Sequence, residues 1–261
     1  MKKFTKVLCL VMAVLMLVSV AACSSSGTGK TGSQSKGTLV MATNAYFPPY
    51  EYYDGGDIVG IDVEIMAAIA DHMGYDFKVE DMEFDSIINA VDSGKADVGL
   101  AGMTVTEKRK ESVDFSVSYA TSKQVIIVNE GSEIKTPDDL DGKTIGVQLG
   151  TTGDLYITWD IEDGVYGADT KVEQYSTAME AVQALNQKKI DAVVIDMEPA
   201  KVFVEKNEGL KILETEYIEE EYSIAIKKGN TELLEAVNEA INDLKESGEL
   251  QKIIDKYITA D

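Results

Sequence analysis

The feature that most constrains the fold is an alternation of strand-like runs with runs whose apolar residues recur every three or four positions. It starts at Thr38 and predicts strands and helices in turn, which is typical of an α/β fold. The predicted strands cover residues 39–43, 76–79, 96–100, 124–128, 144–147, 172–175, 192–195 and 222–226. The predicted helices cover residues 61–69, 87–91, 151–159, 179–185, 233–244 and 250–257.

A short internal similarity supports two related halves. At one constant offset, Lys95, Asp97, Val98 and Met103 match Lys189, Asp191, Ala192 and Met197. Each copy combines a helix, a short polar turn and a buried strand. Duplication would explain the match, and a chance likeness between two α/β units is the alternative.

The charge balance excludes several classes of function. The chain has 24 basic and 46 acidic residues, so a nucleic acid is a poor partner for its surface. His72 is the only histidine and lies in an apolar helical pattern, which argues against a histidine-based catalytic triad or a histidine-rich metal site. We expect neither a metal ion nor a cofactor.

The N-terminus has the pattern of an export signal. Three lysines precede an apolar or small run over residues 7–22, which is too short for a comfortable membrane span and predicts a signal peptide over residues 1–22. Val20-Ala21-Ala22 precede Cys23, as in a bacterial lipobox, so we expect Cys23 to carry a lipid such as palmitate. The alternative is an ordinary secretory signal with an incidental cysteine.

The segment that follows Cys23 is rich in serine and glycine, so residues 23–37 are predicted to be the lipidated cysteine and a flexible tether. Cys9 would leave with the signal, and the mature chain would have no intramolecular disulfide. These features predict an extracytoplasmic protein that is lipid-anchored to the bacterial cell membrane.

Candidate ligand-binding residues follow the predicted strands, where open α/β sheets bind their ligands. After strand 96–100, the small residues Ala101 and Gly102 expose backbone groups and Thr104 adds a hydroxyl. Arg109 comes next and is the only arginine among 24 basic residues. A planar guanidinium suits a carboxylate ligand, whereas the alternative is a surface arginine in a charged helical turn.

Two further strand ends have complementary chemistry. The turn over residues 148–153 leads into a helix, whose free N–H groups attract an anion, although capping by Thr151 or Thr152 alone is the alternative. Strand 192–195 ends at Asp196, which would suit an ammonium or cap the following helix. One cationic and one anionic partner together describe a zwitterion, and thus a free α-amino acid.

Motifs along nearly the whole mature chain resemble one family. They are FPPYEY at 47–52, GIDVEI at 60–65, GKADVGLAGMTVTEKR at 94–109, VDFS at 113–116, DLDGKTIGVQLGTT at 139–152 and KIDAVVID at 189–196. The chain resembles the polar amino-acid solute-binding proteins of ABC importers, of the glutamine-, histidine- and lysine/arginine/ornithine-binding type.

The resemblance implies a two-lobed periplasmic-binding-protein-like fold of type II, with two α/β lobes that are joined by two crossing strands and close on the ligand. Lobe 1 would comprise residues 38–122 and 222–261, and lobe 2 residues 125–219. The protein would be a monomer that delivers a free L-amino acid to the permease subunits of an ABC transporter. It would not be an enzyme.

The resemblance also implies roles for ten residues. Arg109, the hydroxyl and N–H of Thr104 and the N–H of Thr152 would hold the ligand carboxylate. Asp196, the Gly102 carbonyl and the Thr104 hydroxyl would hold the ammonium. The remaining contacts would come from Ala101, Phe47, Phe84, Asn44 and Gln148, with the two rings on either side of the ligand side chain.

The two amides predict the class of ligand. Asn44 and Gln148 are neutral, so a neutral polar side chain is favoured over a cation, and glutamine is the leading candidate. Glu51 would reverse this preference if its carboxylate faced the pocket. Two alternative functions are an amino-acid-sensing lipoprotein and an enzyme similar to cyclohexadienyl dehydratase, with Glu198 or Glu51 as the acid.

Overall fold

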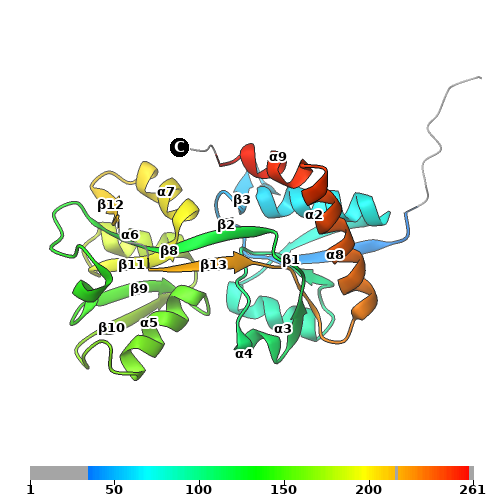
Figure 1. The fold of residues 1–261 in the computed structure, drawn as a ribbon. Helices are drawn as coiled ribbons and strands as arrows, with labels where there is room; N and C mark the ends of the chain where they lie inside the picture. Colours follow the sequence, from blue (N-terminus) through cyan, green and yellow to red (C-terminus); the bar gives the residue numbers. More distant parts are fainter. Residues whose placement is uncertain (1–34, 215–216, 259–261) are drawn as a thin grey trace, which may run out of the picture. The chain divides into compact units, whose positions relative to one another are not determined.

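The computed structural model describes residues 35–214 and 217–258 (Figure 1). The predicted signal peptide, the lipidation site at Cys23 and the tether up to residue 34 lie outside the described residues. Within the described ranges, no helix is both long and apolar enough to cross a membrane.

The first sheet has the strand order β5-β1-β6-β14-β7. Its strands are β1 (Thr38–Thr43), β5 (Asp76–Asp81), β6 (Val98–Gly99), β7 (Val113–Phe115) and β14 (Ala225–Lys227). β1 is parallel to β5 and β6, whereas β14 is antiparallel to β6 and β7. Its helices are α2 (Ile61–Met73), α3 (Ile87–Asp92), α4 (Glu107–Lys110), α8 (Thr231–Glu246) and α9 (Glu249–Asp255), with a 3-10 turn at Phe84–Ser86.

The second sheet has the order β10-β9-β11-β8-β12, and β13 also pairs with β8. Its strands are β8 (Ala120–Asn129), β9 (Thr144–Gln148), β10 (Lys171–Tyr175), β11 (Ala192–Asp196), β12 (Leu210–Ile212) and β13 (Ile218–Tyr222). Its helices are α5 (Thr152–Glu162), α6 (Ala178–Asn186) and α7 (Met197–Lys206), with a 3-10 turn at Pro137–Leu140. The predicted α/β architecture is therefore confirmed.

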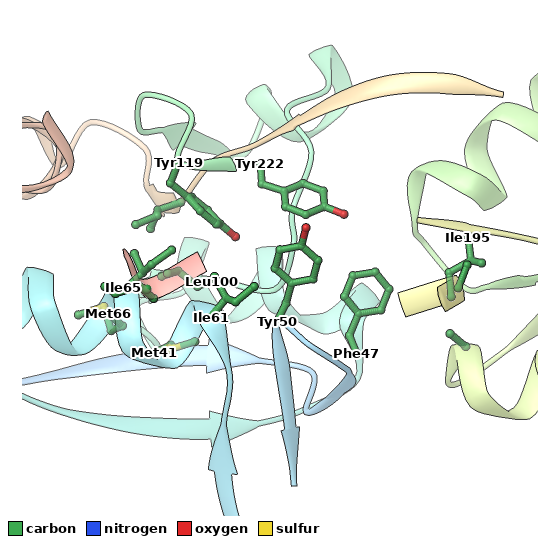
Figure 2. Packing of buried hydrophobic residues seen from close by; sticks show 14 of the residues in the cluster. Met41, Phe47, Tyr50, Ile61, Ile65, Met66, Leu100, Tyr119, Ile195 and Tyr222 are labelled. Carbon is green, nitrogen blue, oxygen red and sulfur yellow. The ribbon is translucent and has the colours of Figure 1, made fainter. Parts of the chain in front are cut away.

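Helix α2 shows how the spacing of apolar residues predicts a helix. Ile61, Ile65 and Ile69 recur at four-residue intervals and are all fully buried. Figure 2 shows the α2 side chains packed beside Met41 of β1 and near Leu100, which follows β6. This packing holds the ends of β1 and β6, and the loops that follow them, in fixed positions.

The two long strands β8 and β13 lie side by side and run between the two sheets (Figure 1). They pair antiparallel, with Gln124 opposite Ile218 and Ala120 opposite Tyr222. Tyr119, directly before β8, packs near Tyr222 and donates a hydrogen bond to Asp62 of α2. Side chains of this pair therefore reach both sheets, as the predicted crossing strands require.

The predicted strand over residues 222–226 is wrong in detail. Tyr222 ends β13 and pairs with β8, whereas Ala225 begins β14 and pairs with β6 and β7 of the other sheet. Between them the Ser223 N–H donates to the Met103 carbonyl, and the Ile224 N–H donates to the Ser116 hydroxyl. The β-prone run divides because its two ends belong to different sheets.

The sequence pattern did not predict the short strands. The hairpin of β2 (Tyr46–Phe47), β3 (Glu51–Asp54) and β4 (Asp57–Val59) forms a separate small sheet. The predicted strand 96–100 forms a ladder only over Val98–Gly99. Runs of two to four residues are too short to show a period, so the sequence could not reveal them.

Candidate functional site

A single cavity collects the predicted ligand-binding residues. Its side chains lie close together and leave a cavity of only about 10 Å³ for a water-sized sphere. It is lined by all ten of them (Asn44, Phe47, Phe84, Ala101, Gly102, Thr104, Arg109, Gln148, Thr152 and Asp196), and by Glu51 and Thr151. These residues come from loops and strand ends of both sheets and from the β2–β3 hairpin. Their assembly agrees with the rule that ligands bind beyond the carboxyl ends of strands.

Arg109 supplies the cation of the cavity. It lies in the short helix α4, where its N–H donates to the Thr106 side chain. The guanidinium donates to the Thr104 carbonyl (2.5 Å) and the Gly150 carbonyl (3.0 Å), and it lies 5.3 Å from the centre of the Phe84 ring. A guanidinium has five N–H donors, so it can also hold a ligand.

Burial decides between the two interpretations of Arg109. The residue is 8% exposed, so it is not a surface arginine in a charged turn. Burial lowers its pKa to about 10, while the negative charge of Glu220 acts in the opposite direction. The side chain therefore stays cationic at neutral pH.

The loop over residues 101–104 presents its backbone to the cavity. Gly102 has φ of +52°, and a Cβ atom there would come within 3.0 Å of the Phe47 ring. Its N–H donates to the Asp62 carboxylate at 2.9 Å. A glycine is required at this position because the conformation is left-handed and the ring is close.

Helix α5 begins at the cavity. Thr151 is its N-cap and accepts a hydrogen bond from the Asp154 N–H, so the capping interpretation holds for Thr151 but not for Thr152. Thr152 is buried, and its hydroxyl lies 3.4 Å from the amide nitrogen of Gln124. The N-terminus of α5, which attracts anions, thus lies on the side of the cavity where Arg109 reaches Gly150.

Asp196 supplies the carboxylate of the cavity. It occupies the N-cap position of α7, but its side chain makes no capping hydrogen bond. It accepts hydrogen bonds from the Gln124 amide (2.8 Å) and the Tyr222 hydroxyl. Burial, and after it the charge of Glu220, raise the pKa of Asp196 to about 7 against the opposite effect of these hydrogen bonds. The side chain is thus directed to the crossing strands rather than to its own helix.

Glu51 and Asp62 form a buried carboxyl pair next to the cavity. Asp62 accepts hydrogen bonds from the Tyr119 hydroxyl (2.8 Å) and the Gly102 N–H. Glu51 Oε2 and Asp62 Oδ1 are buried and make no hydrogen bond among the described residues. Burial raises the pKa of Glu51 well above its usual value and that of Asp62 to about 6. Glu51 thus lines the cavity as a carboxyl group whose neutral form is favoured by burial and by the neighbouring charge of Asp62.

The neutral side chains form the rest of the wall. The Gln148 amide donates to the Asn44 side-chain oxygen (2.9 Å) and to the Ser176 carbonyl (3.0 Å). The Asn44 amide donates to the Met82 carbonyl at 2.8 Å. Phe47 and Phe84 are both nearly buried. Asn44 and Gln148 therefore already contact each other across the cavity.

The sequence reasoning missed the partners that hold the site residues. Gln124 and Glu220 lie on the crossing strands and touch or approach Asp196, while Asp62 lies in the first turn of α2. In the acidic run of Glu219, Glu220 and Glu221 only the middle residue is buried, and only strand alternation could have placed it inside. No local motif marks such contacts because they join residues far apart in the chain.

Comparison with known proteins decides the family. The model of the bacterial extracellular solute-binding proteins, family 3, matches residues 39–260. The chain belongs to this family. Its relatives include the arginine-binding extracellular protein ArtP of Bacillus subtilis, 34% identical over all of both chains. Another is the L-cystine-binding protein TcyJ of Escherichia coli strain K12, 33% identical over 96% of this chain and 94% of that protein.

Solved structures show that this family 3 protein is similar to known binding proteins in fold as well as in sequence. An ancestral arginine-binding protein bound to arginine is 41% identical, with a TM-score of 0.81 over 86% of this chain and all of that one. The same kind of protein bound to glutamine is 40% identical, with a TM-score of 0.80 over 87% of this chain and all of that one. The chain has the two-lobed α/β fold of these binding proteins.

Proposed function

We propose that this extracellular solute-binding protein holds one free polar L-amino acid in the cavity and delivers it to the permease subunits of an ABC transporter. The observation that carries the proposal is the pairing of a buried guanidinium with a buried carboxylate in one cavity. Arg109 would hold the ligand carboxylate, and Asp196 would hold its ammonium. Each charge of the zwitterion then meets an opposite charge.

The proposal includes a lipid anchor at Cys23 and movement of two lobes. The lobes would be residues 38–122 with 222–261, and residues 125–219. Arg109 and Gly150 come from different lobes in this division and are hydrogen-bonded to each other. Ligand contacts shared in this way would favour a closed state. The names of the relatives support binding rather than catalysis as the role of the site.

A neutral polar ligand, with glutamine first, remains the proposed occupant. The Asn44 and Gln148 amides line the cavity, and Glu51, which also lines it, has a pKa raised by burial and by Asp62, which favours its neutral form. Arginine is the second candidate, because ArtP is named for arginine and an ancestral arginine-binding protein has been solved with arginine and with glutamine.

A thermal-shift screen against the amino acids tests the function, since a ligand at 100 times its Kd stabilises the folded state by about 2.7 kcal/mol. Competition calorimetry then ranks the ligands. Glutamine is expected to bind more tightly than arginine. Tenfold tighter binding of arginine that is abolished in Glu51→Gln would assign the pocket to a cation, and no stabilisation by any amino acid would refute the proposed function.

A further inference from the structure

Two buried carboxyl groups share one amide donor beneath the cavity. The Gln124 side-chain nitrogen donates to Asp196 at 2.8 Å and to Glu220 at 3.0 Å. All three residues are at most 6% exposed. The two acceptor oxygens therefore lie less than about 6 Å apart, a spacing at which like charges interact strongly in a protein interior.

The pair is only partly neutralised by its surroundings. The Tyr222 hydroxyl donates to Asp196, the hydroxyl of Tyr156 approaches Glu220, and the positive charge of Arg109 acts on both acids. One further buried acid, Glu51, acts on Asp196 at longer range. On the outer side, Glu220 lines a surface groove with other charged residues (Lys123, Glu198, Lys201, Glu219 and Glu221).

Buried polar atoms without hydrogen-bond partners also indicate that the charges of the two acids are only partly compensated. Glu220 Oε1 and Gln124 Oε1 are buried and make no hydrogen bond among the described residues. Gln124 has a single amide nitrogen to serve two carboxylates, and hydrogen bonds alone do not cancel a second buried charge. When both acids are ionised, this arrangement favours the arrival of a further positive charge beside Asp196.

We propose that Glu220 is a positioning residue for ligand capture, which acts through Gln124 and Asp196 and makes binding of the α-ammonium depend on release of a proton. In the empty cavity near neutral pH, Asp196 carries a proton in about half of the molecules, and the step concerns these molecules. When the ammonium arrives, the O–H bond of Asp196 breaks, the proton passes to solvent and the carboxylate pairs with the ammonium. The positive charge of the ligand ammonium replaces that of the released proton, so the net charge around Asp196 is unchanged. This inference rests on the proposed function.

The size of the effect follows from the titration of Asp196, whose pKa is about 7. Binding should release about half a proton at pH 7, about 0.9 at pH 6 and about 0.1 at pH 8. The affinity should be about tenfold weaker at pH 6 than at pH 8. Calorimetry with L-glutamine and with L-arginine, in buffers of different ionisation enthalpy, measures both quantities.

The decisive variant is Glu220→Gln, and Glu221→Gln is its matched control, because Glu221 is the exposed neighbour on the same strand. We expect Glu220→Gln to release less than about 0.2 proton at pH 7, with less than threefold change in Kd between pH 6 and pH 8. The control should keep the wild-type values. A merely structural role of Glu220 would change Kd equally at both pH values and leave proton release intact, which would overturn the inference.

A measurement on the wild-type protein covers the case in which Glu220→Gln does not fold. The carboxyl ¹³C resonance of Asp196 should titrate near pH 7 without ligand and well below pH 6 with ligand. Binding without proton release at any pH from 6 to 8 would overturn the inference but leave the proposed function standing. Failure to bind any amino acid would instead refute the proposed function.

Discussion

Replacing Arg109 by lysine keeps the positive charge but removes the planar guanidinium, so the variant tests the geometry of the N–H donors alone. The Arg109 guanidinium donates two hydrogen bonds, to the Thr104 and Gly150 carbonyls, and its other N–H groups can donate to the ligand. A lysine ammonium has three donors on one atom and cannot reach two carbonyls and a carboxylate in the same arrangement. We expect separate losses in binding and in stability.

The binding loss follows from the ligand's hydrogen bonds. Losing two charge-assisted hydrogen bonds, at about 1.5–3 kcal/mol each, weakens Kd by about 10² to 10⁴. The stability loss follows from the two carbonyls, since each buried polar group left without a partner costs about 1–3 kcal/mol. Calorimetry measures the binding loss, and urea unfolding of the ligand-free protein measures the stability loss.

Lys110→Gln provides the control in the same helix. Lys110 is exposed and pairs with Glu107, a surface contact that contributes little. This variant should leave Kd within threefold of the wild type. If Arg109→Lys also stays within threefold, the ligand carboxylate does not bind at Arg109 and the reasoning is refuted.

Three further predictions concern the charged pocket and its closure. In calorimetry, Asp196→Asn should weaken the binding of amino acids at least tenfold more than the binding of the matching des-amino acids, because only the amino acids carry an ammonium. Equal losses of affinity for both kinds of ligand would contradict the ammonium site. The Glu51–Asp62 pair binds its proton more tightly in the folded than in the unfolded state, so its contribution to stability is present at pH 4 and is lost as the pH rises through the folded pKa of Asp62, about 6. Because burial raises the pKa of Glu51 in the folded state, Glu51→Gln should gain stability relative to the wild type in urea unfolding between pH 4 and pH 8; the same difference at both pH values would contradict a raised pKa of Glu51. In small-angle scattering, a saturating ligand should reduce the radius of gyration, and an unchanged value would exclude lobe closure.

The sequence by itself determined the elements whose side chains repeat over several turns or pleats. Ile61, Ile65 and Ile69 predicted α2, and the single arginine in a strand-end loop pointed to a ligand site. These signals are local, because the periodicity of a helix and the chemistry of a side chain can be read from neighbouring residues. Within each sheet, parallel strands bring their carboxyl ends to one edge, which is where the sequence placed most of the ten residues. The meeting of residues from both sheets and from the β2–β3 hairpin in one cavity is a result of the tertiary structure.

Only the tertiary structure decided which acids are buried and what they touch. Glu219, Glu220 and Glu221 are identical in sequence, yet only the middle one faces Gln124 and Asp196. Glu51 lines the cavity, and its pKa is raised by burial and by Asp62, which approaches it from another element. The protonation of a carboxyl group depends on its burial and on charges brought close by the fold, and neither quantity is present in a local sequence pattern.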